Sequence, residues 1–164
     1  MQKLRIIIGL VGAILCSNFG ETQAQGVEFS GSPTSIISNS AIIPEGKKLF
    51  YTSGLTALAT DASLPEGDYA KYGDTKTQAL GILKKLKEML EEKGLKMSNV
   101  FAMKVFIAPD VKTKIYDFDG WNAAYKMYFG TPENPIKPVR ATLGISTLVN
   151  ANKFIEIELI AVYP

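Results

Sequence analysis

The spacing of apolar residues predicts two helices, and these helices constrain the fold more than any other feature of the sequence. Apolar side chains recur at helical spacing after Thr75, and Gly94 is placed to end this first helix. Thr75 and Gln78 fit a capping box at its start. Aromatic residues mark one face of a second helix, which begins near Phe118 and is stopped by Gly130. Each helix therefore has an apolar stripe that must pack on another element.

The other apolar runs predict strands. Short β-rich runs at residues 40–43 and 48–53 are separated by a Pro-Glu-Gly turn and predict a hairpin. Residues 100–108 predict a buried strand, and residues 139–145 and 154–162 predict the last two strands. The order β-β-α-β-α-β-β predicts an α+β domain, with one sheet and two long helices on one face. Because the opposite face would expose apolar side chains, a small oligomer that covers it is expected.

The start of the chain differs from the rest. A short basic segment is followed by a ten-residue apolar run, and then by a polar stretch that includes Ala24. This layout is typical of a secretory signal peptide, and the apolar run is too short to span a bilayer. We therefore expect cleavage of residues 1–24 and export, to the periplasm, without a stable membrane anchor; an uncleaved N-terminal anchor is the alternative. Residues 25–36 are interpreted as a leader, and residues 37–164 as one domain.

The residue types that are missing exclude many kinds of chemistry. The sequence holds no histidine, and its one cysteine, Cys16, lies in the predicted signal peptide. Ser-His-Asp triads, cysteine nucleophiles, disulfides and His/Cys zinc sites are therefore excluded. A carboxylate-built Mg²⁺ or Ca²⁺ site stays open, but no calcium-loop or phosphate-loop motif supports a metal or cofactor. With a formal net charge of +2, the chain also gives no reason to expect nucleic-acid binding.

Arg140 is the only arginine outside the predicted signal peptide, and every other basic residue there is lysine. Its planar guanidinium matches a carboxylate with two parallel hydrogen bonds, which lysine cannot do. Strand alternation places Arg140, Thr142 and Gly144 on one face, and in the last strand it places Glu156 and Glu158 together. These side chains predict a polar cluster on neighbouring strands. It is either a structural ion pair across the sheet or a site for a small carboxylate.

Five segments share their motifs and order with one known family. They are K-L-F-Y-T-S-G at 48–54, Y-G-D-T-K-T-Q at 72–78, D-F-x-x-W-N-A-A-Y at 117–125, P-V-R-A-T at 138–142 and I-E-I-E-L-I-A at 155–161. Together they resemble the Rid (reactive intermediate deaminase, YjgF-like) family over nearly the whole expected domain. The last two motifs, in this order and spacing, are the most specific.

The resemblance implies a chorismate-mutase-like α+β fold and a homotrimer with clefts between subunits. It also implies hydrolysis of 2-imino or 2-enamino acids to 2-keto acids and ammonia, with no cofactor. In such a cleft Arg140 would clamp the substrate carboxylate, and Glu156 would position or polarise the attacking water. Five further residues would line the cleft, the last two from the adjacent subunit: Ser53, Gly54, Thr142, Asn122 and Trp121.

The sequence departs from the family at one place. A Gly-Pro-Tyr segment, whose tyrosine helps to close the pocket, is replaced by I-S-N-S-A at residues 37–41, with Ser40 near the place of the tyrosine. The competing function is a non-catalytic trimeric module that binds small carboxylate ligands between subunits. Both functions predict binding that depends on Arg140, and only the enzyme predicts turnover. Endoribonuclease activity, a label sometimes given to this family, has little support without histidine or a basic patch.

Overall fold

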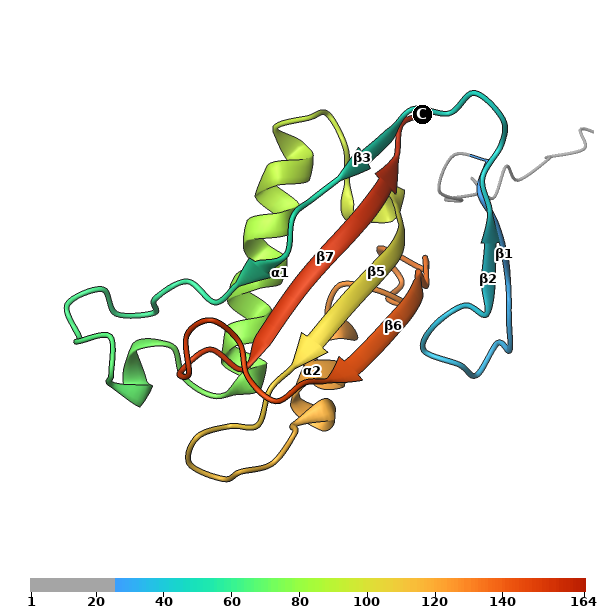
Figure 1. The fold of residues 1–164 in the computed structure, drawn as a ribbon. Coiled ribbons are helices and arrows are strands. Elements are labelled where there is room, and N and C mark those ends of the chain that lie inside the picture. The colour runs from blue at the N-terminus through green and yellow to red at the C-terminus, as the bar shows by residue number, and fades with distance from the viewer. Residues whose placement is uncertain (1–25) are drawn as a thin grey trace, which may run out of the picture.

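The computed structural model describes residues 26–164, so the predicted signal peptide at residues 1–24 lies outside the described residues. A five-stranded sheet carries two helices on one face (Figure 1). The strands lie in the order β3 (Leu49–Tyr51), β7 (Ile155–Val162), β5 (Val100–Ile107) and β6 (Val139–Gly144), and β4 (Leu55–Thr56) also pairs with β7. The mixed α/β fold, with a single main sheet and both helices on one side, agrees with the prediction.

The pairing of the strands fixes where β6 and β7 lie. β7 is antiparallel to β3, β4 and β5, whereas β5 and β6 are parallel. A parallel pair needs a crossover connection, and here the crossover contains α2 (Phe118–Tyr125), which packs behind the sheet (Figure 1). β5 therefore lies between β6 and β7, and β6 forms one edge of the main sheet.

The predicted hairpin between residues 40–43 and 48–53 is wrong. β2 (Ser40–Ile42) pairs with β1 (Glu28–Ser30) in a separate two-stranded ribbon beside the sheet (Figure 1), and β3 pairs with β7. The turn itself is present, since Gly46 has a φ of 77°. A turn signal predicts that the chain bends, but it does not specify which strand each run will pair with.

Helix α1 (Thr75–Glu91) is capped by a residue other than the one predicted. The Asp74 side chain, not Thr75, accepts the backbone N–H of Thr77 at 2.8 Å. Gln78 is buried instead of closing a capping box: its amide donates to the carbonyls of Gly73 and Asn152 and accepts the N–H of Phe154. Gln78 thus ties the start of α1 to the loop before β7.

Helix α2 is shorter than predicted: it ends at Tyr125, and residues 126–128 form turns. The buried side chains of α1 and α2 pack against those of β5 and β7 to form the main core, in which Trp121 and Tyr125 are fully buried. None of the helices within residues 26–164 has both the length and the apolar character needed to cross a membrane.

Candidate functional site

Arg140 lies on the helix-facing side of the edge strand β6. Its register partner on β5 is Met103, whose side chain belongs to the core between sheet and helices. Its Nη2 donates to Asn122 Oδ1 at 2.8 Å, and its Cζ lies 4.6 Å from the ring centre of Tyr125 and 5.3 Å from that of Trp121. Contacts of this kind between a guanidinium and aromatic faces are attractive and help to hold the group in place.

The charge of Arg140 has no acidic partner. Its Nε and Nη1 are buried and make no hydrogen bond, and no carboxylate within residues 26–164 lies within ion-pair distance of it. Burial lowers the pKa of the guanidinium, although Tyr125 opposes that shift. A buried charge with unpaired donors is costly, and a bidentate carboxylate is the partner that best removes this cost.

The predicted polar cluster of Arg140 with Glu156 and Glu158 does not form within one chain. Ile155 and Ile157 face the core, so strand alternation turns both glutamates to the opposite face of the sheet. Glu158 is paired there with Lys104 at 2.8 Å. Because β5 separates β6 from β7, Arg140 and Glu156 lie two strands apart, roughly 10 Å, and on opposite faces. The ion-pair interpretation of Arg140 is therefore wrong.

Glu156 has its own set of neighbours near the other edge of the sheet. A β-carbon on Gly54 would collide with the Glu156 carboxylate, so the carboxylate lies directly against the backbone at this glycine. Thr56 of β4 is the register partner of Glu156, and Ser53 precedes Gly54 in the chain. We call Ser53, Gly54 and Glu156 the glutamate half-site.

The remaining predicted residues gather around Arg140. Thr142 lies on the same face of β6, and Trp121 and Asn122 contact Arg140 from α2 of the same chain. The expectation that these two residues approach Arg140 from the adjacent subunit is wrong, because the crossover after β5 returns directly behind β6. We call Arg140, Thr142, Asn122 and Trp121 the arginine half-site.

Sequence reasoning missed Tyr125 as a neighbour of Arg140. The sequence assigns it only to an aromatic stripe, which is the usual pattern of core packing. The spacing is the signal that could have identified it. Tyr125 lies three residues after Asn122 and four residues after Trp121, so the three side chains are neighbours on the surface of α2. A residue that contacts Trp121 and Asn122 is therefore expected to lie near Tyr125 as well.

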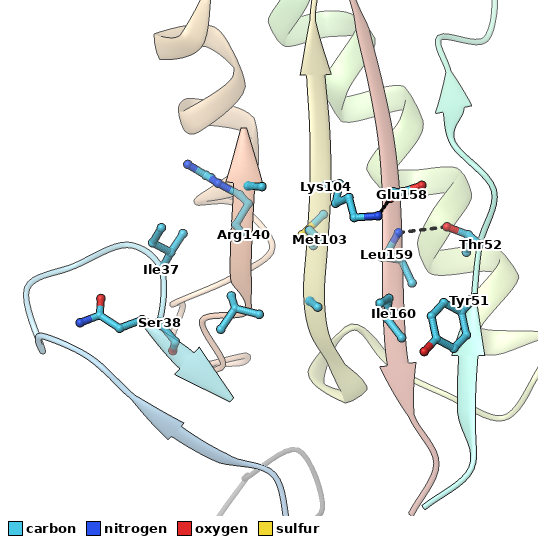
Figure 2. Close-up of a pocket in the computed structure, with 14 residues that line it drawn as sticks. Ile37, Ser38, Tyr51, Thr52, Met103, Lys104, Arg140, Glu158, Leu159 and Ile160 are labelled. Carbon is cyan, nitrogen blue, oxygen red and sulfur yellow. Dashed lines mark hydrogen bonds and ion pairs between the residues drawn. The ribbon is translucent and has the colours of Figure 1, made fainter. Parts of the chain in front are cut away.

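A groove of about 690 Å³ lies on the open face of the sheet (Figure 2). Its walls include Tyr51, the Lys104–Glu158 pair and the segment at residues 37–39. This segment runs beside β6, where Ser38 forms a parallel bridge with Val139. This segment belongs to the stretch that replaces the Gly-Pro-Tyr motif. The Ser40 hydroxyl lies 2.7 Å from that of Ser30, so Ser40 serves the β1–β2 ribbon and does not substitute for a tyrosine.

Replacing Gly54 with alanine is expected to lower any activity that uses Glu156 by roughly 10- to 100-fold, because the new methyl group displaces the carboxylate. Unfolding in urea should show a cost of about 1–3 kcal/mol from the overpacked contact. Gly81→Ala is the matched control: nothing lies near its position, it is within α1, and it should keep full activity. Full activity of Gly54→Ala would show that the position of Glu156 does not matter.

Comparison with known proteins decides the family. A family model described as Endoribonuclease L-PSP matches residues 32–163. The chain belongs to the YjgF/Rid family. A RutC family protein of Aquifex aeolicus (strain VF5) is 36% identical over 87 residues, which are 53% of this chain and 63% of that relative. The match thus spans less than two thirds of the relative's length.

Solved structures of this family share the fold. The Escherichia coli YjgF gene product is 28% identical with a TM-score of 0.56, and E. coli TdcF, solved with bound serine, is 26% identical with a TM-score of 0.55. Each comparison covers 74% of this chain and 85% of the other. The Rid family protein YyfB of Yersinia pestis, at 16% identity, matches in fold alone, with a TM-score of 0.62 over 84% of this chain and 98% of that one.

Proposed function

We propose that this Rid protein hydrolyses 2-imino and 2-enamino acids to 2-keto acids and ammonia, with Arg140 as the clamp for the substrate carboxylate. The observation that carries the proposal is the buried guanidinium, with two free donors and no acidic partner within residues 26–164. A ligand carboxylate supplies both the missing charge and the missing acceptors. The bound serine of TdcF is a small carboxylate of this kind in a relative that is 26% identical.

Two copies of the chain are needed to complete the site. The arginine half-site lies at the β6 edge and the glutamate half-site at the opposite side of the sheet, so neither edge alone offers both groups. A ring of copies, in which the β6 edge of one faces the β3–β4 edge of the next, brings the two half-sites together. We propose three copies, the number that the family resemblance implies, with the open sheet faces covered by neighbours.

The chemistry in such a cleft needs only positioning and proton transfer. Arg140 fixes the carboxylate, and Glu156 of the next copy takes a proton from water as its oxygen bonds to carbon 2 of the imine. The nitrogen gains the proton taken up by Glu156 and then the proton of the new hydroxyl, the C–N bond breaks, and ammonia leaves as the carbonyl forms. Thr142, Ser53 and Asn122 line the cleft and supply polar contacts to substrate and water. No metal or cofactor takes part in these steps.

The proposal is tested by measuring ammonia and keto acid release when the purified protein meets imines generated in place from several amino acids. Release above the rate in buffer, absent in Arg140→Ala, is the expected result. If keto acids bind in an Arg140-dependent way and no imine is hydrolysed faster than in buffer, the alternative of a carboxylate-binding module is the better account. If neither binding nor turnover depends on Arg140, both functions are wrong.

A further inference from the structure

A second groove, of about 460 Å³, lies at the end of helix α1 and outside both half-sites. Its lining includes the buried apolar side chains of Leu95 and Met97, between the end of α1 and the start of β5. The loop before β6 contributes Glu133 and Asn134. None of the lining residues belongs to a half-site or to the groove on the open face of the sheet. The volume is within the range of small-molecule sites.

Asn134 brings to this groove a buried acceptor that has no partner. Its Nδ2 donates to the carbonyl of Tyr128 at 2.7 Å, and its backbone N–H donates to Thr131 Oγ1 at 3.0 Å, so the amide is held in one orientation. Only 9% of the residue is exposed, and its Oδ1 makes no hydrogen bond. Native proteins leave few such atoms, so the groove is suited to a ligand that donates here.

Two opposite charges line the groove without pairing. Lys96 follows the end of α1, Glu133 lies in the loop before β6, and neither forms an ion pair within residues 26–164. The other charged residues of the groove, Lys87 and Glu91, pair with each other at 3.6 Å. The last turn of α1 holds no basic residue, so the negative end of the helix dipole adds to the attraction for a cation. The groove thus offers one contact for a cation and another for an anion.

We propose that this groove binds a free amino acid with an apolar side chain. The ammonium, which has three donors, meets Asn134 Oδ1 and the Glu133 carboxylate. The ligand carboxylate meets Lys96, and its side chain packs on Leu95 and Met97. A simple amine has no group for Lys96, and a simple acid has no donor for Asn134. A small zwitterion is therefore the class of molecule that uses all of these contacts, and its binding is independent of the proposed function.

The test uses the methionine methyl groups as reporters. Met97 lines this groove, whereas Met103 is the register partner of Arg140 and lines the groove on the open face of the sheet. In NMR spectra of protein labelled with ¹³C at these methyl groups, leucine is expected to shift the Met97 signal, equally in the wild type and in Arg140→Lys. Any binding at Arg140 is detected separately at Met103. Two analogues, 3-methylbutylamine without the carboxylate and 4-methylpentanoate without the ammonium, should bind at least about tenfold more weakly at Met97.

Exchanges of the two exposed charges test the contacts one at a time. Lys96→Gln and Glu133→Gln are each expected to weaken leucine binding at least about fivefold at Met97 and to leave the Tm unchanged, because both side chains are exposed and unpaired. Lys93→Gln is the matched control: it is also exposed, lies three residues before Lys96 and does not line the groove, so it should bind leucine as the wild type does.

Three outcomes would overturn the proposal. The Met97 signal could stay in place with leucine, or it could move at equal concentrations of leucine and of the two analogues, which would show that the groove does not recognise a zwitterion. A Met97 shift that is lost in Arg140→Lys would show that leucine binds at the arginine half-site instead. Imine hydrolysis is measured independently of all three, so failure here leaves the proposed function standing.

Discussion

Arg140→Lys is expected to lower kcat/KM for imine hydrolysis by at least about 100-fold, although the positive charge is kept. A lysine ammonium cannot form the two parallel hydrogen bonds of the guanidinium, and it cannot pack over the rings of Trp121 and Tyr125 in the same way. The effect should be seen in both kcat and KM, because the clamp orients the substrate as well as binding it. Steady-state kinetics with imines generated in place measure both.

The stability of this variant separates a functional arginine from a structural one. A structural arginine would be paired, and its loss would cost several kcal/mol. Arg140 has no acidic partner within residues 26–164, and two of its donors make no hydrogen bond, so the Tm of Arg140→Lys should equal that of the wild type or exceed it. Lys85→Arg is the control for an exchange of arginine and lysine away from the site, on α1, where Lys85 pairs with Glu88. It should leave both kcat/KM and the Tm unchanged. A large fall in Tm would contradict the account.

Asn122→Asp is expected to weaken binding of small carboxylates at least about 100-fold while raising the free energy of unfolding by about 1 kcal/mol. The side chains of asparagine and aspartate have nearly the same shape, and Asn122 Oδ1 already accepts from Arg140 Nη2 at 2.8 Å. The introduced carboxylate would therefore neutralise Arg140 from within the chain and compete with any ligand. Titration with pyruvate and unfolding in urea measure the two effects, which have opposite signs.

The increase in the free energy of unfolding expected for Asn122→Asp depends on pH, because it comes from a carboxylate paired with Arg140. A carboxylate beside Arg140 has its pKa lowered in the folded state, so its contribution to stability is present above the unfolded value of about 4 and is lost as the pH falls below it. Asn122→Ala is the control: it removes the hydrogen bond without adding charge, and should weaken binding less than tenfold. Tight pyruvate binding by Asn122→Asp would show that the ligand does not meet Arg140.

The local features of the fold could be predicted from the sequence. The apolar period after Thr75 and the strand runs at residues 100–108, 139–145 and 154–162 correspond to α1, β5, β6 and β7, with small shifts at their ends. The periodicity of the apolar residues indicates which side of a helix or strand is buried, and this pattern can be found from residues that are close in the sequence. Alternation likewise placed Arg140 and Thr142 on one face of β6, and the structure confirms it.

The partners of each element could not be predicted in this way. The strand order puts β5 between β6 and β7, and the sequence holds no local signal for that choice, so the expected cluster of Arg140 with Glu156 fails. The same limit explains why residues 40–42 pair with β1 and not with β3. The predicted capping box at Thr75 does not form, for a different reason. Gln78 is buried, and its side-chain amide donates to the carbonyl of Asn152 in the loop before β7.

Because Arg140 and Glu156 are separated in each chain, mixed oligomers can show whether one site joins Arg140 of one copy to Glu156 of the next. Chains carrying Arg140→Lys and chains carrying Glu156→Gln would be co-expressed with different tags, and the mixed oligomers purified by both tags. Each variant alone should be inactive. In a mixed trimer purified by both tags, one interface of the three joins an intact Arg140 to an intact Glu156, so about one third of the wild-type imine hydrolysis should return. Mixed oligomers of the same size as the wild type that stay inactive would contradict the shared site.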